Sequence, residues 1–65
     1  MRVKINGDET EIPENTDIHA LLKSRDLTPD RVAVELNKKL LRSAKYDTAL
    51  GEGDEIEIVT FVGGG

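Results

Sequence analysis

Few side chains in this sequence could do chemistry, and their spacing forms no catalytic or metal-binding pattern. The 65 residues contain one histidine, His19, and no cysteine, which removes the usual thiolate nucleophile and soft-metal ligand. Ser43 and Thr48 have no histidine placed by the sequence to activate them. Acidic residues gather at positions 52–57, but they lack the calcium-loop pattern. We therefore expect a protein that is not an enzyme and that holds no metal.

The distinctive reactive group that remains is the C-terminal carboxylate of Gly65. The sequence ends in Val62-Gly63-Gly64-Gly65, and glycine, which has no Cβ, makes a thin and flexible chain. Such a segment could carry its carboxylate into a narrow active site of another protein, or it could be a frayed end. We expect residues 62–65 to form a flexible glycine tail on a folded β-grasp domain that spans residues 1–61.

Composition and charge limit the class of protein and its partners. A length of 65 residues, 37% hydrophobic content and a net charge of −4 suit one small acidic domain. Phosphate binding needs a basic face, so no nucleic acid is expected as a partner. The first residues lack the apolar region of a signal peptide, and no apolar run approaches the ~20 residues of a membrane span. We expect a cytoplasmic protein that is monomeric when free and has no membrane partner.

Two short alternating segments at the N-terminus predict a hairpin. Residues 1–5 and 9–12 both alternate apolar with charged side chains, the period of a half-buried strand. Asn6-Gly7 between them favours a tight turn, because both residues tolerate positive φ. The residues expected to face the core are Met1, Val3, Ile5, Thr10 and Ile12.

The next element is predicted to be a short helix over residues 17–25. Ile18, Leu21 and Leu22 have the spacing of one apolar helical stripe. Asn15 and Thr16 are suitable N-caps, and Asp17 would place a negative charge in the first turn, where the helix dipole favours it.

The second half of the chain predicts three further strands, over residues 31–36, 40–42 and 55–61. Inward-facing residues are expected to be Val32, Val34, Leu36, Tyr46, Leu50, Ile56 and Ile58. The order of hairpin, helix, strand, short strand and long strand is that of an α+β β-grasp (ubiquitin-like) domain. In this fold a mixed sheet of four to five strands packs on one short helix.

The end of the last strand breaks the expected pattern. Glu55 and Glu57 should face solvent, but Val59 and Phe61 continue on the same face. Two neighbouring apolar side chains beside a flexible tail are typical of a docking surface. The alternative is a twist or bulge that moves Phe61 into the core.

The sequence also resembles the ThiS family, the bacterial sulfur carrier proteins of thiamine biosynthesis. The likeness runs essentially end to end and is most specific in three segments. They are Val32-Ala33-Val34-Glu35-Leu36-Asn37, Leu50-Gly51-Glu52-Gly53-Asp54-Glu55-Ile56-Glu57-Ile58-Val59 and Phe61-Val62-Gly63-Gly64-Gly65. Two departures are Tyr46, where many members have tryptophan, and Leu41-Arg42, where many have Pro-Arg.

The resemblance implies a chemistry for the tail and a set of partners. An E1-like adenylating enzyme would use ATP to adenylate the carboxylate of Gly65, so that the carrier itself binds no cofactor. A sulfur donor protein would displace AMP and leave a thiocarboxylate, and thiazole synthase would take that sulfur for the thiazole ring of thiamine. Gly63 and Gly64 would thread a narrow channel, and Val59, Phe61 and Val62 would form the partner surface.

Three alternatives stay open from the sequence. The small subunit of molybdopterin synthase shares the fold and the terminal Gly-Gly, although that family is usually longer. A ubiquitin-like protein modifier would be conjugated to lysines through Gly65. The last alternative is a plain interaction domain with a disordered end.

Overall fold

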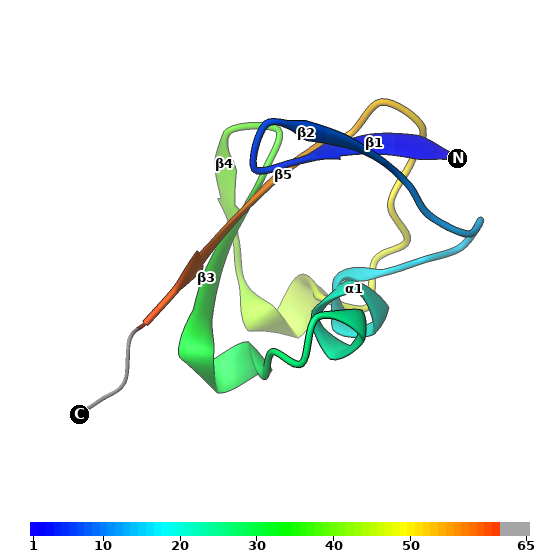
Figure 1. Ribbon diagram of the computed structural model, residues 1–65. Coiled ribbons are helices and arrows are strands. Elements are labelled where there is room, and N and C mark those ends of the chain that lie inside the picture. The colour runs from blue at the N-terminus through cyan, green and yellow to red at the C-terminus, as the bar shows by residue number, and fades with distance from the viewer. Residues whose placement is uncertain (62–65) are drawn as a thin grey trace.

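The computed structural model describes residues 1–61, and residues 62–65 lie outside that range. The strands are β1 (Arg2–Ile5), β2 (Asp8–Glu11), β3 (Val32–Leu36), β4 (Lys39–Leu41) and β5 (Glu55–Thr60), and the helix is α1 (Ile18–Ser24). Single 3-10 turns cover Pro29–Arg31 and Ser43–Lys45. The sheet has the order β2-β1-β5-β3-β4, and it curves over α1 (Figure 1).

This arrangement confirms the expected β-grasp fold, with five strands. β1 and β5 pair in parallel, while the other neighbouring strands are antiparallel. The chain therefore places its first and last strands side by side in the middle of the sheet. The end of β5 and the N-terminus lie at opposite ends of the molecule (Figure 1).

The core lies between the sheet and α1, and it consists of the apolar residues that the alternation predicted. Buried side chains include Val3, Ile5, Ile12, Ile18, Leu21, Leu22, Val32, Val34, Tyr46, Leu50, Ile56 and Ile58. Met1, Thr10 and Leu36 were also expected to face inward, and they are only half-buried at the edge of this core. The core is thus small, as the chain length requires.

The start of α1 differs from the expectation. Asp17 is the N-cap, because its Oδ1 accepts from the Ala20 N–H at 2.8 Å. The predicted caps are used otherwise: the Thr16 hydroxyl donates to the Pro13 carbonyl at 2.6 Å, and Asn15 has a left-handed backbone with φ of 66°. The helix is therefore seven residues long and begins after Asp17.

Strand ends also differ from the predicted ranges by a residue at one or both ends. The third strand begins at Val32 instead of Arg31, because Pro29–Arg31 forms a 3-10 turn. The last strand ends at Thr60 instead of Phe61. Alternation identifies the middle of a strand better than its ends, where local turns decide the conformation.

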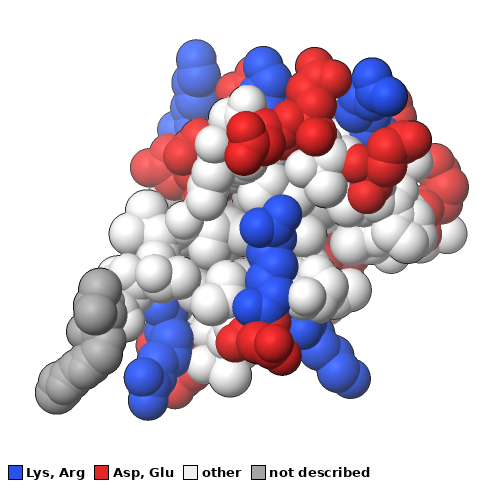
Figure 2. Space-filling model, in the orientation of Figure 1, with Lys and Arg blue, Asp and Glu red and all other residues white. Residues whose placement is uncertain are grey.

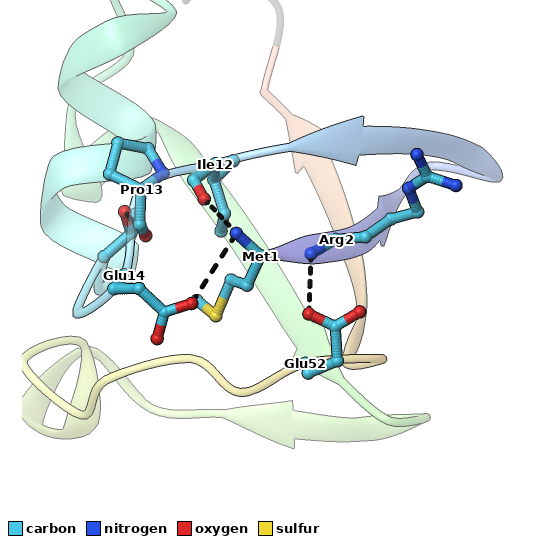
Figure 3. Close-up of polar contacts among 7 residues, drawn as sticks. Met1, Arg2, Ile12, Pro13, Glu14 and Glu52 are labelled. Carbon is cyan, nitrogen blue, oxygen red and sulfur yellow. Dashed lines mark hydrogen bonds and ion pairs between the residues drawn. The ribbon is translucent and has the colours of Figure 1, made fainter.

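The N-terminal end of β1 is held by polar contacts. The Met1 amino group donates to the Ile12 carbonyl at 2.8 Å and lies 3.7 Å from a carboxylate oxygen of Glu14. The Arg2 N–H donates to Glu52 at 2.9 Å, which ties β1 to the loop before β5 (Figure 3).

The other end of β1 is joined to β5 by a side chain. Only two residue pairs make up the parallel register, Lys4 with Glu55 and Ile5 with Ile56. Asn6 then continues it: its N–H donates to the Ile56 carbonyl at 2.8 Å. Its side-chain amide also accepts from the Ile58 N–H at 2.7 Å and donates to the Ile58 carbonyl at 3.2 Å. The amide of Asn6 thus acts as one more residue of β1.

Asn37 has the corresponding role at the start of β5. It exchanges two bonds with the backbone of Glu55, one through its own N–H at 2.7 Å and one through its Oδ1 at 2.9 Å. Its Nδ2 donates to Asp54 at 3.1 Å, and Asp54 also accepts from the Gly51 N–H at 2.7 Å. Both asparagines have positive φ, which this residue tolerates better than most.

Replacing Leu22 with alanine should remove a large part of the core. Leu22 is 1% exposed, so the change should lower the free energy of unfolding by about 2–5 kcal/mol. A protein of this size has a stability of only a few kcal/mol, so Leu22→Ala should be largely unfolded at 37 °C. Urea denaturation followed by circular dichroism measures this. Leu40→Ala, at a side chain 65% exposed, is the control and should change the midpoint little.

Replacing Asn6 with glycine should loosen β5 without straining the turn. Glycine accepts the φ of 49° at this position, but the Ile58 N–H and carbonyl lose their partner. We expect the free energy of unfolding to fall by about 1–3 kcal/mol.

The control is Asn15→Gly, at another residue with positive φ, 66°, whose side chain makes no hydrogen bond within residues 1–61. Both variants carry the same backbone entropy cost of glycine. Equal urea midpoints for the two would contradict a stabilising role for the Asn6 amide.

Candidate functional site

The candidate site is the end of β5, from which the chain leads into the glycine tail. Val59 is 58% exposed and Phe61 is 57% exposed. The Phe61 N–H donates to the Arg31 carbonyl at 2.8 Å, so the chain stays aligned with β3 one residue beyond the strand. The alternative of a bulge that buries Phe61 is therefore wrong, and the expected exposure of both side chains is confirmed.

The strand register explains why these side chains stay uncovered. Val59 lies opposite Ala33 on β3, and alanine is too small to shield it. Glu57 lies opposite Glu35, and Glu35 lies opposite Leu40 on β4. Residues directly opposite one another share a face. The outer face of the sheet is therefore apolar near the end of β5 and charged further back, where Lys4 lies opposite Glu55.

Surface charge follows this division in part. In Figure 2 uncharged surface borders one side of the end of β5 and a basic side chain lies on the other, while most acidic side chains, mixed with basic ones, gather toward the far end of the visible face. The exposed Leu40 side chain, 65% accessible, belongs to the same outer face. The sequence predicts a strand at Leu40 but does not show that its side chain is exposed. The register between β3 and β4 decides which face of the sheet Leu40 lies on.

A hollow lies next to the end of β5. Thr60 and Phe61 line one part of it, and the segment after α1, which contains Asp26, Asp30 and Arg31, lines the rest. A hydrogen bond from the Thr28 side chain is the main cause that lowers the pKa of the Asp30 carboxyl below its ordinary value. Asp30 therefore keeps its negative charge at neutral pH.

The other residues with possible chemistry have structural surroundings. His19 is exposed, and its ring packs edge-on against the buried ring of Tyr46, with 5.8 Å between the two ring centroids. Across residues 1–61, no three His, Asp or Glu side chains gather as metal ligands would. No helix in that range is long and apolar enough to cross a membrane.

The remaining site residues of the sequence prediction are not placed. Val62, Gly63, Gly64 and Gly65 lie outside the described residues, so the role expected for each stays a prediction. The structure brings Val59 and Phe61 to the point where the tail begins. It adds Asn6, which sequence reasoning assigned only to the turn and whose bonds to Ile58 arise from tertiary pairing.

Similar proteins include both short chains and longer ones. A thiamine biosynthesis protein (ThiS) from Geobacter metallireducens has a solved structure with a TM-score of 0.80 and 29% identity, and each chain covers the whole of the other. A ubiquitin-like protein from the archaeon Caldiarchaeum subterraneum shares the fold, with a TM-score of 0.54 and 19% identity over 98% of this chain and 100% of that one.

A thiazole synthase from Paramagnetospirillum magneticum is 36% identical over 66 aligned residues, which include the whole of this chain. The present chain spans only 20% of the length of that relative. The family model for the ThiS family matches residues 3–65, nearly the whole sequence. With the β-grasp fold and this match, the chain belongs to the ThiS family.

Proposed function

We propose that this protein is a sulfur carrier of thiamine biosynthesis and that Gly65 carries the sulfur as a thiocarboxylate. The observation that carries the proposal is the way β5 ends. A strand held by Asn37 at Glu55 and by Asn6 at Ile58 is followed, after Phe61 and Val62, by three glycines. Membership of the ThiS family supports the same function.

The chemistry needs activation of Gly65 by another protein. A carboxylate is a poor electrophile, because it is anionic and has no good leaving group. An E1-like adenylating enzyme transfers the AMP part of ATP to the Gly65 carboxylate and releases pyrophosphate. The outer sulfur of a persulfide on the sulfur donor protein then displaces AMP and bonds to the terminal carbon. A thiol cleaves the S–S bond that still joins this sulfur to the donor and forms a disulfide with the donor, which leaves a thiocarboxylate on the carrier. The carrier supplies no catalytic group of its own and binds no cofactor.

The rest of the tail and the end of β5 have supporting roles in this proposal. Gly63 and Gly64 lack side chains, so they fit a channel too narrow for other residues. Val59, Phe61 and Val62 form the surface on which the adenylating enzyme docks. Exposed apolar side chains beside a reactive terminus are suited to this role, because their burial stabilises the complex.

Thiazole synthase is the proposed acceptor of the sulfur. The thiazole synthase from Paramagnetospirillum magneticum aligns with the whole of this chain over a fifth of its own length. The presence of a carrier-like segment in that longer protein supports a functional link between the carrier and thiazole synthase. The acceptor would receive the tail in the same extended form as the adenylating enzyme.

Deleting Gly65 should abolish adenylation and leave folding unchanged. The buried core of residues 1–61 is made of large apolar side chains, and Gly65 has no side chain to add to it, so the melting temperature of the shortened protein should equal that of the full chain. ATP–pyrophosphate exchange with the adenylating enzyme of the same host measures the first effect, and circular dichroism the second. A large loss of stability would instead show that the tail is structural.

Mass spectrometry of the protein isolated from its host under thiamine limitation tests the chemistry directly. A carrier should show the mass increase of one oxygen replaced by sulfur, located at Gly65. An isopeptide adduct through Gly65 would instead identify a protein modifier. Co-purification with molybdopterin synthase rather than thiazole synthase would assign the carrier to the other pathway.

Replacing both Val59 and Phe61 with alanine should weaken docking on the adenylating enzyme. Both side chains are more than half exposed, so stability should change little. The KM for the carrier in pyrophosphate exchange should rise about tenfold or more, the equivalent of about 1.4 kcal/mol or more of lost binding. Leu40→Ala, further across the outer face, is the matched control and should raise KM less. An unchanged KM for the double variant would contradict the proposed surface.

A further inference from the structure

The last residue of β5 has backbone groups that pair with nothing in the described chain. In the β3–β5 ladder, Phe61 bonds to Arg31 and Glu55 bonds to Asn37. Antiparallel strands alternate bonded with non-bonded pairs, so Val59 bonds to β3 and Thr60 does not. The N–H and carbonyl of Thr60 therefore point away from β3, toward the side on which β1 lies.

The β1 side of β5 is occupied only as far as Ile58. The Asn6 amide takes both backbone groups of Ile58, and the turn at Gly7 then leads the chain back into β2. Beyond this turn β5 continues beside β3 alone (Figure 1). The alternation of the β3 ladder leaves Thr60 unbonded to its partner Val32. Outside that ladder, no hydrogen bond within residues 1–61 reaches the N–H or carbonyl of Thr60, and the residue is exposed.

We infer that this edge, which begins at Thr60, receives an extended backbone segment of the adenylating enzyme as an added strand. The inference rests on the proposed function. The N–H and the carbonyl of Thr60 point to the same side. Another extended chain placed there can form a hydrogen bond with each of them. The added strand lies in line with β1, and Asn6 determines where it must start.

The hollow beneath this edge indicates the chemistry of the incoming segment. Thr60 follows Ile56 and Ile58 in the alternation, so its side chain lies on the helix side of the sheet. The residue opposite Thr60 on the added strand lies on that side too, next to the hollow. Two carboxylates, Asp26 and Asp30, and one guanidinium, Arg31, line this hollow. The net negative charge favours a lysine or arginine at that position of the enzyme.

The edge is also continuous with the tail that the enzyme must hold. Pairing at Thr60 would hold the end of β5 against the enzyme at the point from which the chain leads toward Gly65. A second copy of this chain could offer the same edge, and the experiment below separates that case.

Replacing Thr60 with proline tests the edge, because it removes the one N–H concerned. That N–H takes no part in the β3 ladder, and proline is tolerated where a strand N–H faces solvent. Thr60→Ala keeps the N–H and is the matched control. In pyrophosphate exchange we expect Thr60→Pro to raise the KM for the carrier about tenfold, the effect of leaving a partner carbonyl unpaired. Thr60→Ala should stay close to the wild type.

Amide hydrogen exchange on the unmodified protein provides a test that does not depend on how a variant folds. In the free protein, the amides of Ile58 and Val59 should be protected and that of Thr60 should exchange fast. With the purified adenylating enzyme and ATP, the Thr60 amide should become protected. Asp26→Asn keeps a residue that tolerates positive φ at this position and should raise the KM in low salt.

Three results would overturn the inference. The first is a Thr60 amide that stays unprotected in the complex, and the second is a Thr60→Pro variant with an unchanged KM. The third is protection of the Thr60 amide that appears without the enzyme and increases with carrier concentration, because this would indicate pairing between two copies of the carrier. Each of these, found while wild-type protein is adenylated normally, would leave the proposed function intact. Wild-type protein that is not adenylated at all would overturn both.

Discussion

The parallel pairing of β1 with β5 is the interaction on which the rest of the structure depends, because it joins the two ends of the chain. Its register contains only two residue pairs, Lys4 with Glu55 and Ile5 with Ile56. Closing a loop that contains most of the chain costs conformational entropy, which the burial of Ile5 and Ile56 in one core helps to offset. This two-pair ladder is short, and the Asn6 amide extends it to Ile58. Without this pairing, the β1–β2 hairpin would be separated from the three strands β5, β3 and β4.

The two faces of β5 serve different purposes, which is possible because strand side chains alternate. Ile56 and Ile58 are buried against α1, while Val59 remains exposed on the outer face. A shift in register by one residue would exchange the two sets. Asn6 and Asn37 oppose such a shift, because each binds the backbone of one particular residue of β5. The same contacts that secure the core therefore keep Val59 on the outer face.

Both edge strands of the sheet have features that discourage aggregation. β2 carries three acidic residues, and β4 is only three residues long. Charged and short edge strands discourage pairing with other chains. The open edge at the end of β5 begins at Thr60, just beyond the reach of Asn6. In the described chain it is one residue long, too short to promote pairing with other chains by itself.

The sequence by itself determined the fold class and most of the inward-facing residues, and it is the source of the proposal that the tail carries the function. Alternation at Val3, Ile5, Ile56 and Ile58 reports which face is buried, and that property is local. Only the tertiary structure decided the N-cap at Asp17, the position of Leu40 on the outer face, the part played by Asn6 and the open edge at Thr60. The N-cap rests on a contact only three residues along the chain, whereas the other features depend on contacts between residues far apart in the chain. No local pattern encodes such contacts, because they exist only once the strands are in register.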